Sequence, residues 1–441
     1  MHNKYTNKGL ILVFLVTITF IALSAVSTVS ADGSVIYVSG SGGNDAWDGQ
    51  SLIYNGTSGP KKSIKNATAT VINGGTLNIA NGVYTGVNNT IIVINKNITL
   101  TGQSKTGTVI NGANTQNIFA ISPDVNVIIQ NLTIINGNGG NGGAINTEGN
   151  LTVINCVFTG NKASNCGGAI CSMKIRSPIY LIVNGCTFTG NKAGNCGGAI
   201  SGDCTLNIAS STFTSNSAGN CGGAIEGGRG NLTVTSCIFT SNAVNNSGGA
   251  IVNSGTSIIT YSKFTSNKAS NCGGAIDNDG NSIITHGSFI SNTARLGYAI
   301  SNSMGSVNAA YNWWGSNAGP SSGMISGSVK YTPWSTIKTA PKVSSTSPKN
   351  GAAGISRTST IKIKFSDKIK ASINWSKIYV KNKYGKKVSI SKSISGNYLY
   401  IKTSKRSSYS SYTVYIPASA VKDYAGNTLA KYYIFKFKTG R

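Results

Sequence analysis

The chain has 441 residues, among them 55 Gly, 8 Pro and 9 Cys, and its formal net charge is +27. A chain of this length holds two or three domains, and abundant Gly with few charges outside its last part is a composition shared with disordered proteins. Here, however, Ile, Val, Leu and Phe recur in regular short runs, which argues against disorder and indicates packed strands.

The first thirty residues have the layout of a secretory signal. Two lysines precede an apolar run from Leu10 to about Val26, and Val29-Ser30-Ala31 places small residues before a cleavage site. We therefore predict that residues 1–31 form a signal peptide and that the protein is secreted or at the cell surface. The alternative is an uncleaved membrane anchor, because the run is almost long enough to span a bilayer.

The residues that follow resemble one end of a known architecture. Residues 35–38, the run GSGGNDAWDG and the stretch from Lys61 to Ala69 are similar to the start of pectate-lyase-like β-helices, in which a short amphipathic helix covers the open end. Such a cap is needed because an exposed terminal coil would pair with other chains. Asp45 and Asp48 are interpreted as turn residues, with a Ca²⁺ site as the alternative.

A repeat of about twenty-five residues fills the middle of the chain. One marker is the motif GGAI, which begins at Gly142, Gly167, Gly197, Gly222, Gly248 and Gly273. A second marker, FTGN, FTSN or FISN, begins at Phe158, Phe188, Phe213, Phe239, Phe264 and Phe289. Strand-like runs such as Asn150–Ile154 lie between them, and nothing in the unit resembles a helix.

Each copy is too short to bury its apolar face alone, so the copies must stack. We predict an all-β fold with a right-handed parallel β-helix over residues 33–335, in which equivalent side chains form ladders about 4.8 Å apart. The Phe positions are expected to stack inside it, and Gly-Gly to form a corner where a Cβ does not fit. The Asn of the second marker, Asn161 in the first copy, is predicted to form a turn ladder, because Asn tolerates left-handed backbone and can bond to its neighbours.

The cysteines recur with the repeat. One position is shared by Cys166, Cys196, Cys221, Ser247 and Cys272, and another by Cys156, Cys186, Ser211 and Cys237. Side chains one coil apart do not converge on a zinc ion, and Ser replaces Cys in both columns, so a metal site is disfavoured. Disulfides between adjacent coils fit the Cα spacing, but parallel Cβ vectors make the torsion awkward. Stacked free thiols are the favoured interpretation, with some disulfides as the alternative.

The GGAI and FxxN motifs resemble the repeats of chlamydial polymorphic membrane proteins, which are β-helical surface adhesins. The same repeats occur in the adhesin-like proteins of methanogenic archaea. Residues 311–320 and 329–334 are similar to the segment that closes the helix in those archaeal proteins. The resemblance implies a pectin-lyase-like β-helix and a role in adhesion, and it favours the archaeal group.

From Pro341 the pattern changes to short strands with period-two alternation, such as Ile361–Phe365. Six or seven such strands in about a hundred residues predict an Ig-like β-sandwich over residues 336–441. The segments SPKNGAAGISRTSTIKIKFSDKI and IPASAVKDYAGNTLA resemble the bacterial Ig-like module of surface-layer proteins.

This last domain is strongly basic. Residues 340–441 hold 18 Lys and 3 Arg against Asp367 and Asp423, a net charge of +19, whereas residues 33–335 carry +6. Lysines on outward-facing alternate positions are candidate contacts for an anionic polymer such as a cell-wall glycan, namely Lys362, Lys364, Lys436 and Lys438. A merely solvated face is the alternative, and nucleic acid is disfavoured because the chain is exported.

A secreted polysaccharide lyase or glycoside hydrolase is the minor hypothesis, since many parallel β-helices cleave acidic polysaccharides. Its candidate catalytic residues form a broken acidic stripe after the GGAI motifs, namely Asp203, Glu226, Asp277 and Asp279. The run from Asp277 to Asn281 is similar to a calcium loop, but its Gly is misplaced for an EF-hand. His286 is the one histidine after the signal, which excludes a His-based triad.

The sequence thus predicts a non-enzymatic, adhesin-like surface protein. Its β-helix is a stalk that presents an adhesive face to glycans or surface proteins of a cell wall, host or partner cell, and its basic domain contacts anionic wall polymer. No metal or other cofactor is predicted, with Ca²⁺ as the alternative. The membrane is a partner only if the signal stays uncleaved.

Overall fold

A computed structural model of the protein describes residues 33–173, 179–336, 340–424 and 426–441. The predicted signal peptide lies outside these residues, as does the start of the linker to the last domain. No helix within the described ranges is long and apolar enough to cross a membrane.

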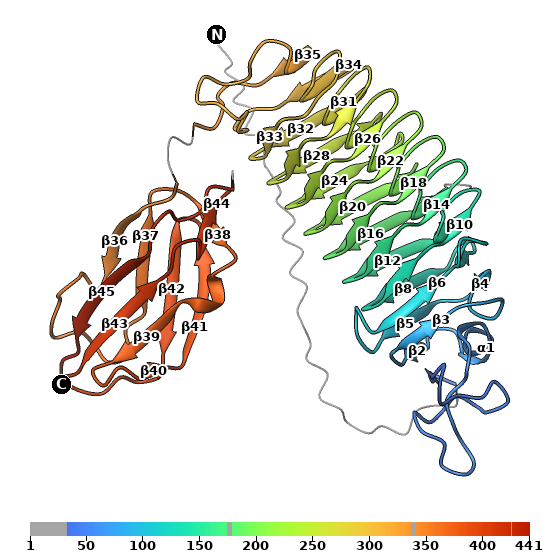
Figure 1. The fold of residues 1–441 in the computed structure, drawn as a ribbon, viewed down its shortest axis with the longest axis horizontal. Coiled ribbons are helices and arrows are strands. Elements are labelled where there is room, and N and C mark those ends of the chain that lie inside the picture. Colours follow the sequence, from blue (N-terminus) through green and yellow to red (C-terminus); the bar gives the residue numbers. More distant parts are fainter. Residues whose placement is uncertain (1–32, 174–178, 337–339, 425) are drawn as a thin grey trace, which may run out of the picture.

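The strands from β1 to β35 run parallel to their neighbours and stack as the coils of a β-helix (Figure 1). The largest sheet has two columns. The first column consists of β4 (Ile92–Ile94), β7 (Phe119–Ile121), β11 (Ile145–Thr147), β15 (Ile170–Ser172), β19 (Ile200–Gly202), β23 (Ile225–Glu226), β27 (Ile251–Asn253), β31 (Ile276–Asn278), β34 (Ile300–Asn308) and β35 (Ile325–Lys330). The second column consists of β1 (Val35–Val38), β2 (Thr76–Ile79), β5 (Ile98–Gly102), β8 (Asn126–Gln130), β12 (Asn150–Ile154), β16 (Tyr180–Asn184), β20 (Thr205–Ala209), β24 (Leu232–Thr235), β28 (Ser257–Thr260) and β32 (Ser282–Thr285), and the ends of the long strands β34 and β35 continue it.

Two narrower sheets complete each coil. One consists of β3 (Gly82–Tyr84), β6 (Thr108–Asn111), β9 (Thr133–Ile135), β13 (Val157–Thr159), β17 (Thr187–Thr189), β21 (Thr212–Thr214), β25 (Ile238–Thr240), β29 (Lys263–Thr265) and β33 (Ser288–Ile290). The other consists of β10 (Asn138–Gly139), β14 (Lys162–Ala163), β18 (Lys192–Ala193), β22 (Ser217–Ala218), β26 (Ala243–Val244) and β30 (Lys268–Ala269). The predicted parallel β-helix is therefore confirmed.

Each of the coils from β8 to β32 bends at three corners where one residue has left-handed backbone. In the coil that contains β12 these residues are Asn155 (φ 51°), Gly160 (φ 65°) and Gly167 (φ 66°). Asn, Gly and Ser recur at these positions because a left-handed backbone crowds the Cβ of larger side chains. The predicted ladder of Asn lies at this turn, but the residue with left-handed backbone is Gly160, one position before Asn161.

The predicted Phe stack runs through the interior. The six Phe of the second marker are fully buried. Neighbouring ring centroids lie 4.8 to 5.0 Å apart with nearly parallel planes. This spacing is that of parallel strands, so backbone pairing between the coils sets the distance between the rings. Trp314 stacks on Phe289 at 5.0 Å and continues the column where the marker ends.

The Asn of the second marker forms a buried polar ladder. Asn191 donates from Nδ2 to Oδ1 of Asn216 at 2.9 Å and from its backbone N to the same oxygen at 3.0 Å. The other Nδ2 proton of Asn191 goes to the carbonyl of Phe158 at 3.1 Å. The same bonds recur at the equivalent residues, which are Asn161, Asn216, Asn242 and Asn267. A column that is fully buried is thus satisfied coil by coil, as burial of amides requires.

The Gly-Gly corner is as predicted. The first Gly has positive φ, as at Gly197 (φ 65°). A Cβ on the second, Gly198, would lie 2.1 Å from the carbonyl oxygen of Gly223 in the next coil. Any side chain there would force neighbouring coils apart, which explains why the motif keeps both glycines.

Both ends of the β-helix are covered. The helix α1 (Ile64–Thr70) places Ile64 and Ala67 in the same core as the first coils, so the predicted N-terminal cap is correct. The Ser63 side chain accepts a hydrogen bond from the backbone N of Asn66 and begins the helix. At the other end Met324 and Trp334 pack against the core.

Residues 340–441 form an antiparallel β-sandwich with its own core, which confirms the predicted Ig-like fold. One sheet has the order β36 (Val343–Ser347), β37 (Ile361–Phe365), β42 (Tyr398–Thr403) and β41 (Ile390–Ser395). The other has the order β40 (Lys387–Val388), β39 (Tyr379–Asn382), β43 (Ser411–Ile416) and β45 (Tyr433–Lys438). A short pair, β38 (Ile369–Ala371) with β44 (Val421–Asp423), and the 3-10 turn η1 (Trp375–Lys377) complete it. The domain lies beside the last coils of the β-helix (Figure 1).

The Asn ladder predicts that removal of a single buried amide lowers the free energy of unfolding substantially. Asn216→Ala removes the acceptor of two Asn191 donors and leaves them buried without a partner, so we expect the free energy of unfolding to fall by about 3 kcal/mol. The measurement is urea unfolding followed by circular dichroism. The matched control is Asn220→Ala in the same coil, whose exposed amide accepts from Asn246. Equal losses in the two variants would contradict a ladder that depends on burial.

Candidate functional site

The predicted acidic stripe is divided between two columns. Glu226 and Asp277 occupy equivalent positions on β23 and β31, with Val252 of β27 between them. They are thus two coils apart, or about 9.6 Å along the axis. Asp203 and Asp279 lie beyond the ends of β19 and β31. Across the described residues no three His, Cys, Asp or Glu side chains come together in a group that could hold a metal ion.

Asp203 and Glu226 lie on neighbouring coils as predicted, but their carboxylates accept hydrogen bonds from backbone and hydroxyl groups of the β-helix itself. Glu226 accepts from Ser201 Oγ and from the backbone N of Gly228, both at 2.8 Å. Asp203 accepts from the backbone N of Arg229 at 2.8 Å. A hollow of about 430 Å³ is lined by Asp203 and Arg229 but not by Glu226. The two acids therefore do not share one open site.

Asp277 is not on an open face. Its side chain is 8% exposed and its Oδ1 has no hydrogen-bond partner. Burial raises the pKa of this carboxyl, and the nearby hydroxyls of Ser301 and Ser247 only partly offset that effect. Asp45 and Asp48 accept hydrogen bonds from the chain around them, as turn residues do.

The cysteine columns differ from one another. In the first, Cys196 and Cys221 form a disulfide, with Cα atoms 4.7 Å apart. The favoured prediction of free thiols alone is wrong for this pair, because parallel pairing brings their Cα atoms within the range that a disulfide spans. In the second, Cys156, Cys186 and Cys237 are buried free thiols. Burial raises the pKa of Cys237 to about 12.

The predicted polymer-binding lysines lie on two different sheets. Lys362 and Lys364 are on β37, and Lys436 and Lys438 are on β45. All four are exposed, and they alternate with buried residues such as Ile363 on the inner face. The structure therefore does not gather them into one patch. It places a basic pair on the outer face of each sheet of the sandwich.

Tyrosines lie beside other lysines of the Ig-like domain, a feature that the sequence did not indicate. On the outer face of the β39 sheet Tyr379 stacks on Tyr415 at 4.9 Å, and Tyr415 on Tyr432 at 6.0 Å. The ammonium groups of Lys381 and Lys387 lie 5.2 and 4.9 Å from the Tyr379 ring. No spacing within one strand signals this cluster, because its three tyrosines come from different parts of the chain and only strand pairing brings them together.

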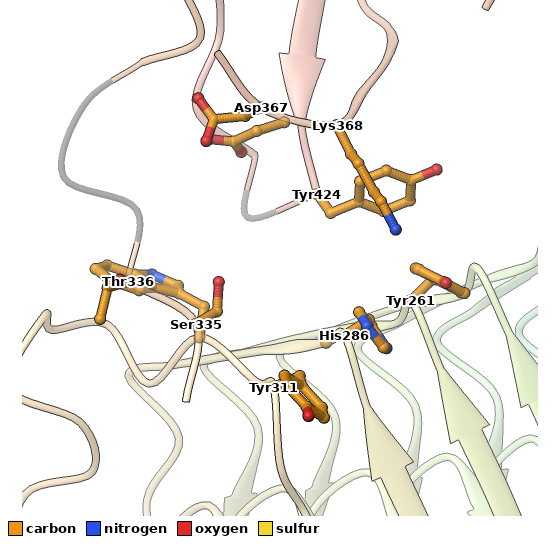
Figure 2. Close-up of a pocket in the computed structure, with 11 residues that line it drawn as sticks. Tyr261, His286, Tyr311, Ser335, Thr336, Asp367, Lys368 and Tyr424 are labelled. Carbon is orange, nitrogen blue, oxygen red and sulfur yellow. The ribbon is translucent and has the colours of Figure 1, made fainter. Parts of the chain in front are cut away.

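A hollow of about 200 Å³ lies between the two domains. Figure 2 shows Tyr261, His286 and Tyr311 of the β-helix on one side and Asp367, Lys368 and Tyr424 of the Ig-like domain on the other. Burial and the nearby Lys368 ammonium lower the pKa of His286, so its imidazole is neutral near pH 7. Burial also raises the pKa of Asp423, which lines the same hollow.

Comparison with protein families matches two parts of the chain. Residues 155–173 and 185–203 match the Chlamydia polymorphic membrane protein repeat, and residues 337–439 match the bacterial Ig-like domain. Among solved structures the chain is similar to ORF18 of Geobacillus virus E2, with 13% identity and a TM-score of 0.30 over 85% of this chain and 72% of that one. A TM-score this low carries no argument. No curated protein matches the chain.

These matches cover the motifs on which the resemblance was based. Residues 155–173 run from the corner before β13 to the end of β15, so the matched unit is most of one coil. The prediction of polymorphic-membrane-protein repeats joined to a bacterial Ig-like domain is confirmed.

The cysteines give a labelling prediction. In the folded protein we expect iodoacetamide at about pH 8 to modify Cys166 and Cys272, which are partly exposed, and to spare Cys237, whose buried thiol has a pKa of about 12. Cys196 and Cys221 should react only after reduction. Peptide mass spectrometry of native and unfolded samples checks this. Modification of Cys237 as fast as that of Cys272 in the native protein would disprove its burial.

Asp277 gives a prediction about pH. Because its pKa is raised on folding, the group stabilises the protein at low pH and this contribution is lost as pH rises through the folded pKa. Asp277→Asn should therefore unfold at a higher temperature than the parent near pH 7, and the gain should vanish near pH 3. Asp279→Asn, two residues away and partly exposed, is the control and should show a smaller gain. A destabilised Asp277→Asn variant near pH 7 would refute the argument.

Proposed function

We propose that this protein is an exported, adhesin-like surface protein without catalytic activity. In this proposal the β-helix is a stalk that presents an adhesive face, and the Ig-like domain attaches the molecule to an anionic polymer such as a wall glycan. The matched repeat belongs by its description to a membrane-protein family, and the second match is to a bacterial Ig-like domain. These matches support a surface protein and leave the partner to be identified.

The β-helix suits a stalk because its coils are tied together along several independent columns. Backbone pairing connects every coil with the next, and the Phe stack and the Asn ladder add two further columns in the coils from Phe158 to Phe289. A mechanical or thermal fluctuation must break all of them at once to separate two coils, which favours a stiff rod. Residues on its outer faces then hold fixed spacings, as a surface for multivalent contact requires.

The main support for attachment to an anionic polymer is the positive charge of the Ig-like domain. Its net charge of +19 over residues 340–441 greatly exceeds what solubility needs. Lysines project from the outer face of both sheets, and tyrosines on the β39 sheet offer rings next to them. Ammonium groups attract carboxylates or phosphates of a polymer, and aromatic rings pack against its apolar faces.

The archaeal assignment is part of this proposal. Residues 311–320 and 329–334 are similar to the closing segment of adhesin-like proteins of methanogens, and here they include Trp314 and Trp334, which cover the last coil. The enzyme hypothesis is weaker, because the oxygens of Glu226 and Asp203 already accept hydrogen bonds from their own chain.

The test measures binding of the mature chain to polygalacturonate, an anionic glycan, over a range of salt. The double variants Lys362→Glu/Lys364→Glu and Lys436→Glu/Lys438→Glu reverse charge on one sheet each. The face that contacts polymer should lose about tenfold in affinity, or about 1.4 kcal/mol, and salt should weaken binding of the parent protein.

The matched control is Lys162→Glu/Lys192→Glu, which makes the same charge change on exposed lysines of β14 and β18. It should leave binding unchanged. Retention that salt does not weaken, or an equal loss in all three variants, would defeat attachment through the Ig-like domain. Release of soluble sugar from the glycan that disappears in Glu226→Ala would instead support the enzyme.

A further inference from the structure

The residues at one corner of the coils change in type near the end of the β-helix. This is the left-handed corner between the second column of the large sheet and the sheet that carries the Phe stack. In the earlier coils small or polar residues occupy it, namely Asn131, Asn155, Gly185, Ser210 and Ser236. In the last three coils it holds Tyr261, His286 and Tyr311, with φ of 54°, 58° and 62°.

Aromatic residues are unexpected at such a position. A bulky side chain with positive φ is rare, because its Cβ crowds the backbone, and strained residues of this kind concentrate at functional sites. The same corner is formed elsewhere in this chain by Asn, Gly or Ser, so folding does not require rings. Three consecutive rings therefore indicate a surface with a purpose of its own.

The three rings form a ladder on the outside of the β-helix. The Tyr261 and His286 ring centroids lie 5.0 Å apart, and those of His286 and Tyr311 lie 5.6 Å apart. The Ig-like domain contacts the ladder through Tyr424, whose ring lies 5.1 Å from that of Tyr261. At the other end Tyr311 remains 52% exposed, so domain packing does not account for the whole ladder.

The opposite wall contains both acidic residues of the Ig-like domain. Among residues 340–441 the acids are Asp367 and Asp423, and both line the hollow that faces the ladder, together with Lys368. Asp423 is fully buried and accepts two hydrogen bonds from Asn427, so it is part of the framework. Asp367 is partly exposed, and its Oδ2 accepts from Ser366 at 2.6 Å. Figure 2 shows Asp367 and Lys368 across the gap from His286 and Tyr311.

The composition of this hollow distinguishes it from the rest of the domain. Among the side chains that line the hollow, the partly exposed Asp367 carboxylate offsets the Lys368 ammonium, and His286 is neutral. The lining therefore carries little net charge, although the Lys370 ammonium lies nearby, 5.3 Å from the Tyr424 ring. The Asp367 carboxylate disfavours an anionic group placed directly beside it in the hollow. A neutral ligand with hydroxyl groups could donate to this carboxylate and accept from Lys368, while its C–H groups pack on Tyr311 and Trp313, which also lines the hollow.

We propose that the hollow between the domains binds a single neutral sugar ring of a glycan. Its volume of about 200 Å³ is below that of sites for larger ligands, which fits one ring rather than a chain. Pockets at domain boundaries with aromatic walls and a few polar groups are common ligand sites. This site is separate from the lysine faces, so it does not depend on attachment to an anionic polymer.

The test titrates the full mature chain with the methyl glycosides of glucose, galactose, mannose and N-acetylglucosamine, followed by the tryptophan fluorescence of the protein and by calorimetry. We expect at least one glycoside to bind with millimolar affinity, and Tyr311→Ser and Asp367→Asn each to weaken it about tenfold. Ser occupies the equivalent corner at Ser236, so the first variant keeps a backbone that the fold accepts. The second changes a partly exposed side chain, which keeps the test valid if the first variant fails to fold.

The matched control is Tyr384→Ser, which removes an exposed tyrosine of the Ig-like domain that does not line the hollow. It should bind as the parent does, and so should Lys436→Glu/Lys438→Glu, whose loss of polygalacturonate binding concerns the other proposal. Absence of binding by all four glycosides, or binding unaffected by both hollow variants, would overturn the sugar site. A change in small-angle scattering of Tyr311→Ser without sugar binding by the parent would show that the ladder serves domain packing alone.

Discussion

The structure depends on one constraint, which is that each coil pairs with the next in a fixed register. Parallel strand pairing places Phe188 beside Phe158 and Phe213, and the Asn ladder closes its hydrogen bonds only if Asn191 lies beside Asn216. A slip by one residue would turn the Phe toward solvent and leave the buried amides without partners. Burial of the polar ladder therefore specifies the register, while the apolar stack supplies much of the stability.

The same constraint shapes the outer surface. Because equivalent residues lie one strand spacing apart, a residue type that recurs in the sequence becomes a column on the outside as well as on the inside. A change of residue type along such a column therefore marks a place where the coils differ in structure or in function. The shift from Asn, Gly and Ser to Tyr261, His286 and Tyr311 is such a change, as is the disulfide between Cys196 and Cys221 in a column of otherwise free thiols and Ser247.

The two domains divide the chemistry between them. The β-helix has few charges, and several of its acids accept hydrogen bonds from its own backbone and hydroxyls, as Glu226 does. The Ig-like domain has lysines on both outer faces and keeps its two acids at the boundary with the β-helix. Attachment to a polymer and recognition of a neutral sugar would therefore use different surfaces of one small domain.

The sequence by itself determined the architecture, because two motifs in phase over six copies leave few alternatives to stacked coils, and because alternation with period two specifies a sandwich. It also located the interior Phe column and the Gly-Gly corner. It placed the Asn ladder at the turn but did not separate Asn161 from the left-handed residue, Gly160, since Asn is favoured both in turns and in buried ladders and only the path of the backbone separates these roles. Only the tertiary structure decided that Lys362 and Lys436 lie on different sheets, that Asp277 is buried, and that Asp367 and Tyr311 line one hollow between the domains. Each of these depends on contacts between residues far apart in the chain, which periodicity within a strand cannot encode.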